Sequence, residues 1–78
     1  MIEEEENESV LVNKKCGARI RAIRNSKGMS AEALSALSGV SEGYITKVER
    51  GEKSPTLSIL SRLANALDVH IVTFFTFE

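Results

Sequence analysis

The sequence has few of the residues that build covalent, metal or catalytic sites. Its 78 residues include one cysteine, Cys16, and one histidine, His70. One cysteine cannot form an internal disulfide, and one cysteine with one histidine cannot complete a metal site. The chain also has no serine–histidine–acid set and no glycine-rich phosphate loop. We therefore expect no enzymatic activity and no cofactor, metal or small-molecule ligand, with Cys16 as a core thiol and His70 flanking the last segment.

Long apolar runs are missing as well. No stretch approaches the ~20 apolar residues that span a bilayer, and the acidic N-terminus differs from a secretory signal, which starts with basic residues. Together with the lone cysteine, these absences predict a cytoplasmic protein without a membrane partner. A chain of 78 residues makes one domain with a modest core, so a partner subunit would help to stabilise it.

The net charge of −1 is the sum of the charges of two unlike parts of the chain. Residues 1–9 contain five glutamates and no basic residue, and we predict that they form a disordered acidic tail. Residues 10–78 contain ten Lys and Arg against six acids, which gives a net charge of +4. Such a cationic body suits a polyanionic partner, although the same charges would also suit a solvated helix face.

The most informative stretch is residues 30–51, SAEALSALSGVSEGYITKVERG. Ser30 and Ser41 can each cap the start of a short helix, while Gly39 can end the first helix in a left-handed conformation. The residues expected to face inward from the two helices and the turn are Leu34, Leu37, Val40, Tyr44, Ile45 and Val48. Two short helices joined by so tight a turn are typical of a DNA-binding helix-turn-helix.

Three further segments flank this motif. Apolar spacings predict a helix from about Val12 to Lys27, and Thr56 can cap another helix that ends near Asp68. The residues expected on the inner faces of these helices are Cys16, Ile20, Ile23, Leu57, Leu60, Leu63, Ala64 and Leu67. The last segment, Val69 to Glu78, fits neither a clean helix nor a clean strand. We predict a short fifth helix from about Ile71, with a strand that pairs with its twin in a dimer as the alternative.

Three phenylalanines near the end of the chain are too apolar for a free tail, and so small a body is unsuited to bury all of them. We therefore predict a C-terminal dimerisation segment. The residues expected at this subunit interface are Ile71, Phe74, Phe75 and Phe77. The alternative is that the phenylalanines fold back on Leu63 and Leu67 of the same chain.

From about Cys16 to Phe75 the sequence resembles the Cro/phage-repressor (Xre-like) family of helix-turn-helix domains. The resemblance lies in the pieces GARIRAIRNSKGMS, LSALSGVS, YITKVERGEKSPTL and LANALDV, in this order and at these spacings. It implies a compact all-α five-helix bundle of the lambda-repressor-like type over residues 10–78. It also implies a homodimer that binds double-stranded DNA at a two-fold operator and regulates transcription. Small restriction–modification controller proteins and Cro-type repressors are the most similar types. The alternative function is an antitoxin or adaptor module whose C-terminal apolar surface binds another protein.

The resemblance also implies roles for individual residues. Its recognition helix corresponds to residues 41–50, and the positions expected to contact bases are Glu42, Gly43, Tyr44, Thr46 and Lys47. The residues expected to contact phosphates are Arg19, Lys27, Ser30, Ser41 and Lys53. Arg24 and Glu49 match a structural salt bridge between the first and third helices.

Three features of the sequence bear on how DNA would be bound, and two of them, Glu42 and the acidic tail, leave alternatives open. Glu42 replaces a residue that is often Arg or Gln in the family; it either adds specificity by penalising wrong bases or simply complements the start of its helix. Ala31 replaces a frequent glutamine, so the phosphate contacts would depend more on backbone N–H groups and on Lys and Arg. The acidic tail either keeps the protein soluble or lies over the basic first helix and competes with DNA.

Overall fold

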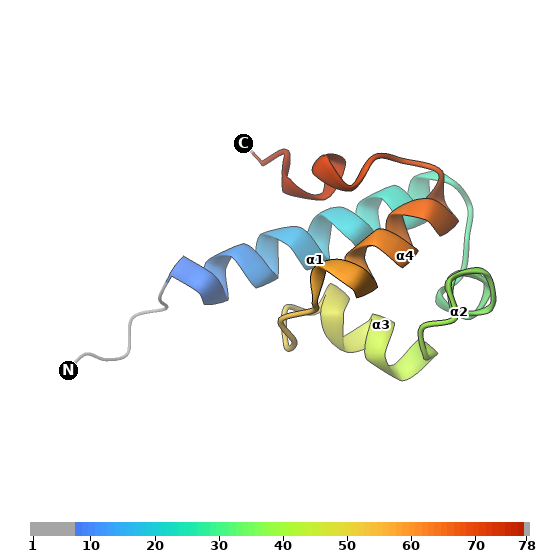
Figure 1. Cartoon of the computed structure of the whole chain (residues 1–78), viewed down its shortest axis with the longest axis horizontal. Helices are drawn as coiled ribbons and strands as arrows, with labels where there is room; N and C mark the ends of the chain where they lie inside the picture. Colours follow the sequence, from blue (N-terminus) through green and yellow to red (C-terminus); the bar gives the residue numbers. More distant parts are fainter. Residues whose placement is uncertain (1–7, 78) are drawn as a thin grey trace.

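The computed structural model describes residues 8–77 and contains four α-helices followed by one short 3-10 helix (Figure 1). In chain order these are α1 (Glu8–Ser26), α2 (Ala31–Ser38), α3 (Glu42–Glu49), α4 (Leu57–Leu67) and η1 (Ile71–Phe75). The all-α expectation is confirmed, and residues 8–77 contain no strand. None of the helices in this range is both long and apolar enough to cross a bilayer.

The short helix predicted from about Ile71 forms there, but as the 3-10 helix η1 and not as a fifth α-helix. The N–H of Thr73 donates to the carbonyl oxygen of His70 at 2.9 Å, which is the i to i+3 pattern of a 3-10 helix. Three successive β-branched residues, Ile71, Val72 and Thr73, crowd an α-helical turn and disfavour its extension. The segment is therefore short and ends at Phe75.

The first helix begins earlier than its apolar spacing predicts. It starts at Glu8, not near Val12, so residues 8 and 9 of the predicted acidic tail are helical. A carboxylate in the first turn is favourable because it faces the positive end of the helix macrodipole. Residues 1–7 of the predicted tail and the last residue, Glu78, lie outside the described residues.

The helix-turn-helix forms as its capping residues predict. The hydroxyl oxygen of Ser30 accepts a hydrogen bond from the N–H of Ala33 at 3.0 Å, and that of Ser41 accepts one from the N–H of Tyr44 at 3.2 Å. Gly39 ends α2 at φ 75°, a left-handed conformation that disfavours a side chain. The turn between α2 and α3 is therefore short, and Val40 is buried within it.

The core forms where α1, α4 and the helix-turn-helix meet. Its buried apolar residues are Cys16, Ile20, Ile23, Leu34, Val40, Ile45, Val48, Leu60, Leu63, Ala64, Leu67 and Phe74. Two leucines expected in it are outside: Leu37 is 65% exposed and Leu57 is 73% exposed. Both stand at a helix end, Leu37 in the last turn of α2 and Leu57 as the first residue of α4.

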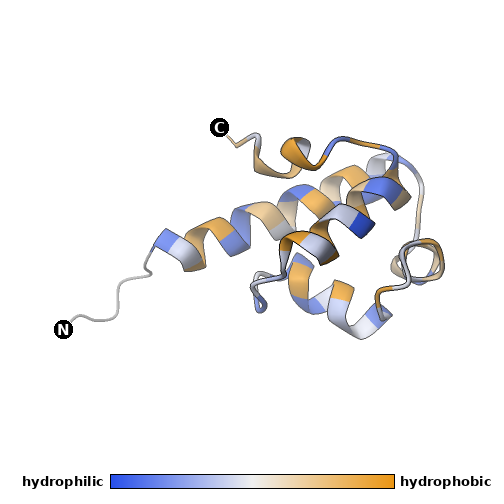
Figure 2. Cartoon of the chain, in the orientation of Figure 1, coloured by the Kyte–Doolittle hydropathy of each residue, from blue (hydrophilic) through white to orange (hydrophobic). Residues whose placement is uncertain are grey.

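The C-terminal segment folds back along α1, on the side of α1 opposite to α3 (Figure 1). Figure 2 shows it as a largely apolar stretch. Phe74 is completely buried in its own chain, so its prediction as an interface residue is wrong and the fold-back alternative holds for it. Phe75 and Phe77 stack edge to face at 6.3 Å between ring centroids. Val72 and Phe75, by contrast, remain exposed.

Candidate DNA-binding surface

Helix α3 attaches to the body through one face. Ile45 and Val48 are buried, which fixes the rotation of the helix about its axis. Three of the residues predicted to contact bases, Glu42, Gly43 and Lys47, are exposed on the rest of its surface. A short helix that is anchored through one face can present its opposite face to a partner, as a recognition helix must.

The other two predicted base-contacting residues are only half exposed. Tyr44 packs partly against the core. The hydroxyl of Thr46 donates to the carbonyl oxygen of Glu42 at 3.0 Å, so its hydrogen is used within the helix. Thr46 therefore offers a partner its methyl group and an acceptor oxygen rather than a donor.

One exposed cation on this helix was missing from the predicted set. Arg50 is the C-cap of α3 and is exposed, and its backbone N–H donates to the carbonyl oxygen of Thr46 at 3.1 Å. It follows Lys47 by three residues, the spacing that brings helical side chains onto one face. That spacing was the sequence signal that could have identified it.

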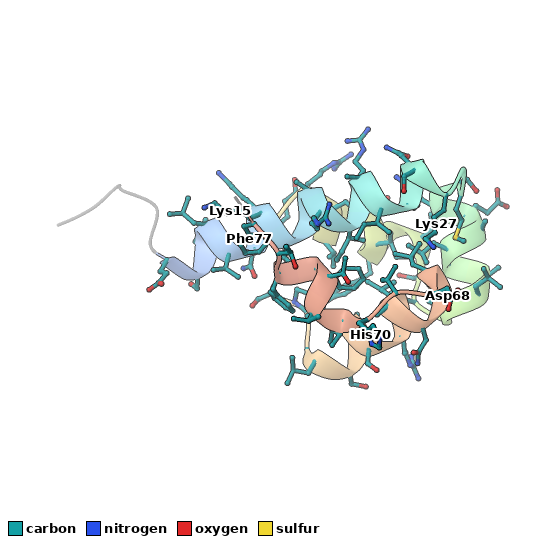
Figure 3. All side chains as sticks on the ribbon, turned by 90° about the horizontal axis from the view of Figure 1, so that it is seen from above. Lys15, Lys27, Asp68, His70 and Phe77 are labelled. Atoms are coloured by element: carbon teal, nitrogen blue, oxygen red, sulfur yellow. The ribbon has the colours of Figure 1, made fainter. Side chains whose placement is uncertain are left out.

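Four of the five predicted phosphate-contacting residues are exposed in the turns and caps around the helix-turn-helix. Ser30 and Ser41 cap α2 and α3. Lys27 is exposed just before α2, at the end of α1 far from Lys15 in Figure 3. Lys53 is exposed in the loop after α3.

Arg19 does not lie with them. It is half-buried on the side of α1 that faces the C-terminal segment, and its Nε donates to the carbonyl oxygen of Thr73 at 3.2 Å. The side of α1 that packs on α3 is a different one. The helical position of Arg19 was predicted correctly, but the element that covers its face was not apparent from periodicity.

The predicted pair of Arg24 and Glu49 is a bidentate ion pair. Nε of Arg24 donates to Oε2 of Glu49 at 2.7 Å, and Nη2 donates to Oε1 at 2.9 Å. The two side chains are only 12% and 6% exposed. A third bond from Nη1 of Arg24 reaches the carbonyl oxygen of Met29 at 2.9 Å. The hydrogen bond to Glu49 raises the pKa of Arg24 above its ordinary value. The pair thus joins the last turn of α1 to the last residue of α3.

Gly17 is a second determinant of the position of α3, and the sequence analysis missed it. Gly17 is buried where α1 crosses α3. A Cβ on it would come within 2.9 Å of the carbonyl oxygen of Glu49 and closer still to that of Val48. No side chain fits in this space, so the backbones of the two helices touch here. A glycine inside an otherwise helical, apolar pattern was the available signal, because glycine weakens a helix unless close approach requires it.

Among residues 8–77, no three metal-binding side chains come together. Cys16 is buried, and desolvation raises the pKa of its thiol above the ordinary value. A neutral buried thiol is a poor nucleophile and a poor metal ligand.

Comparison with known proteins agrees with this arrangement. Residues 20–74 match the family model described as helix-turn-helix. A curated helix-turn-helix transcriptional regulator of Sinorhizobium fredii is 37% identical over 65 residues, which cover 83% of this chain and 84% of the relative. The control protein C.SmaI of Serratia marcescens is 40% identical over 57 residues, which cover 73% of this chain and 68% of that protein. Other relatives are longer, and the chain spans 41% of the regulator SlrR of Bacillus subtilis.

Solved structures give the same result. The restriction–modification controller protein C.AhdI of Aeromonas hydrophila superposes with a TM-score of 0.78 at 40% identity, over 80% of this chain and 94% of that one. A point mutant of the controller protein C.Esp1396I superposes with a TM-score of 0.77 at 30% identity, over 91% of this chain and 86% of that one. The chain therefore belongs to the helix-turn-helix (Xre-like) family of DNA-binding transcription regulators.

Proposed function

We propose that this protein is a sequence-specific transcription regulator that acts as a homodimer on a two-fold operator, in the manner of a restriction–modification controller protein. Helix α3 enters the major groove, and Lys47 and Glu42 contact base edges. The observation that carries the proposal is the attachment of α3 through one face, with Ile45 and Val48 buried, which leaves Glu42, Gly43 and Lys47 exposed. The names of the controller relatives support the restriction–modification assignment.

The proposed contacts fall into two groups, those to base edges and those to phosphates. Lys47 donates to guanine O6 and N7, whereas Glu42 accepts only from a donor such as the amino group of cytosine or adenine. Lys27, Lys53 and Arg50 contact phosphates, together with the start of α2, where backbone N–H groups and the Ser30 hydroxyl face an anion. Arg19 is left out of this set because its side chain is turned to the C-terminal segment.

Selection of bound sites from random duplex DNA tests the proposal. We expect enrichment of an inverted repeat whose half-sites are centred about one helical turn, roughly 34 Å, apart. Lys47→Ala should relax base preference at one position of each half-site. Lys53→Ala should weaken all sequences alike and reduce the slope of log affinity against log salt by about 1. If no duplex is enriched at low ionic strength, the proposal is wrong.

The homodimer is proposed to form through the exposed part of the C-terminal segment. Val72 is 65% exposed and Phe75 is 39% exposed, while Ile71 and Phe77 are half-buried beside them. Adjacent exposed apolar side chains of this size favour association, because burying them removes apolar surface from water. Val72 was absent from the predicted interface, and Phe74 drops out of it.

Sedimentation of Phe75→Asp tests the interface. We expect a shift towards monomer, because a charge would be buried between the subunits. Leu37→Asp is the matched control, since Leu37 is also apolar and exposed but lies on α2. Equal behaviour of the two variants would contradict the proposed interface. A parent protein that is monomeric, and that associates only with a different protein, would favour the antitoxin or adaptor function instead.

A further inference from the structure

A groove with basic walls runs between α1 and the end of the C-terminal segment. It has a volume of about 380 Å³. Its lining residues are Lys15, Ala18, Arg19, Ala22, Thr76 and Phe77. The small side chains of Ala18 and Ala22 form an open floor on α1, and the ring of Phe77 forms an apolar wall. Figure 3 shows Lys15 beside Phe77, and the Nζ of Lys15 lies 5.9 Å from the ring centroid.

The charges of the groove select an acidic occupant. Lys15 and Arg19 line it, and its lining includes no carboxylate among residues 8–77. Arg19 is held in place through Nε, which donates to the carbonyl oxygen of Thr73, so the rest of its guanidinium is positioned without further ordering. A second copy of this chain that offered the same face would bring cations against cations. A segment that joins apolar and acidic side chains fits the apolar wall and the basic rim together.

The chain contains one segment with this chemistry. Residues 1–6 read MIEEEE, with two apolar side chains followed by four successive glutamates. The exposed cations on α3 and in the loop after it, Lys47, Arg50 and Lys53, are interspersed with Glu42 and Glu52. Charge complementarity therefore favours the groove over the candidate DNA-binding surface as the place where the acidic segment binds.

The segment is also long enough to reach the groove within one chain. Helix α1 begins at Glu8, and Lys15 and Ala22 lie about 10 and 21 Å further along its axis, at 1.5 Å per residue. Seven residues ahead of Glu8 extend up to about 23–25 Å. Reversal at the start of α1 thus brings the glutamates alongside Lys15 and Arg19.

We propose that the acidic N-terminal segment, residues 1–7, binds in the groove between α1 and the C-terminal segment, with its glutamates on Lys15 and Arg19 and its first apolar residues against Phe77. Bound there, the segment would lie along α1 beside Thr76 and Phe77 rather than compete with DNA at α3.

A spin label at Ile2→Cys in the full-length, ¹⁵N-labelled protein tests the proposal. The native Cys16 is buried, so the label reacts selectively at the new cysteine. We expect loss of amide signal intensity at Lys15, Ala18, Ala22 and Phe77. Raising the salt to about 1 M, where the Debye length is about 3 Å, should restore much of the intensity. Mixing spin-labelled ¹⁴N protein with unlabelled ¹⁵N protein shows whether the segment binds its own chain or a partner copy.

Two charge variants complete the test. Lys15→Gln should restore the amide intensities, whereas Arg21→Gln should not, because Arg21 is an exposed cation of the same helix outside the groove. Intensity loss centred on Lys47 and Lys53, or spread evenly over the protein, would overturn the proposal. So would equal effects of the two variants. The experiment contains no DNA, so its outcome does not depend on the proposed DNA binding.

Discussion

Replacing Arg24 by Met tests whether the ion pair holds α3 in place. The change removes three hydrogen bonds of Arg24 and leaves the carboxylate of Glu49, which is 6% exposed, without its cation. Breaking one partner of a buried pair costs about 3–5 kcal/mol. At about 0.05–0.15 kcal/mol per residue, a 78-residue domain has a total stability of about 4–12 kcal/mol. The variant should therefore lose a large share of the free energy of unfolding.

The assay is urea unfolding followed by far-ultraviolet circular dichroism. Arg21→Met is the matched control, because Arg21 is exposed on the same helix, and it should change stability by less than about 0.5 kcal/mol. The double variant Arg24→Met/Glu49→Leu should lose less than Arg24→Met alone, since no unpaired charge stays buried. The reasoning is refuted if Arg24→Met costs no more than Arg21→Met, or if the double variant costs as much as the sum of the two single changes. DNA binding must be compared at equal folded fraction.

Four further predictions concern three glycines and the thiol. Gly17→Ala should destabilise by about 1–3 kcal/mol in urea unfolding and weaken DNA binding even when fully folded, because the new Cβ pushes on the carbonyl oxygen of Glu49. Gly43→Ala should stabilise by about 0.5–1 kcal/mol, since Gly43 lies inside α3 with open space around it. Gly39→Ala, at φ 75°, should destabilise by about 1–2 kcal/mol; equal effects at the two positions would contradict this. Burial raises the pKa of the Cys16 thiol above its ordinary pKa of 9.0. The contribution of the neutral thiol to folding stability is therefore fully present below pH 9.0 and is lost as the pH rises through the raised pKa. The free energy of unfolding of the parent should therefore decrease more at alkaline pH than that of Cys16→Ala.

The local elements were predictable from the sequence because their signals are local. Ser30, Ser41 and Thr56 cap helices as expected, each accepting a hydrogen bond from the N–H three residues later. Gly39 and Asp68 end helices in left-handed conformations, at the ends of the apolar patterns that predicted those helices. The N-caps and helix ends follow from residue type and spacing, without knowledge of the tertiary structure.

The predictions that differ from the structure concern side chains whose burial depends on which other element packs against them. Periodicity places Leu37 and Leu57 on apolar faces, but it does not show that these two side chains stay largely exposed in the folded chain. It likewise does not separate Phe74, which is buried, from Phe75, which is exposed, because both follow the same pattern. Arg19, which was predicted to contact phosphate, faces the C-terminal segment and lies apart from the other predicted phosphate contacts, and the sequence of a basic helix does not indicate which element packs over it. These properties depend on tertiary contacts that the sequence pattern alone does not specify.

Helix α1 separates the two surfaces of the molecule. One side of it meets α3 through Gly17 and Arg24, and another side holds the C-terminal segment through Arg19 and Lys15. A rigid helix between two sites fixes their relative orientation, so the geometry of a dimer built on the C-terminal segment would set the spacing of its two recognition helices. Changes on the two sides should consequently differ in kind. Loss of a contact to α3 should alter binding to a single half-site, whereas loss of the contact between Arg19 and η1 should spare the half-site and weaken only the paired operator.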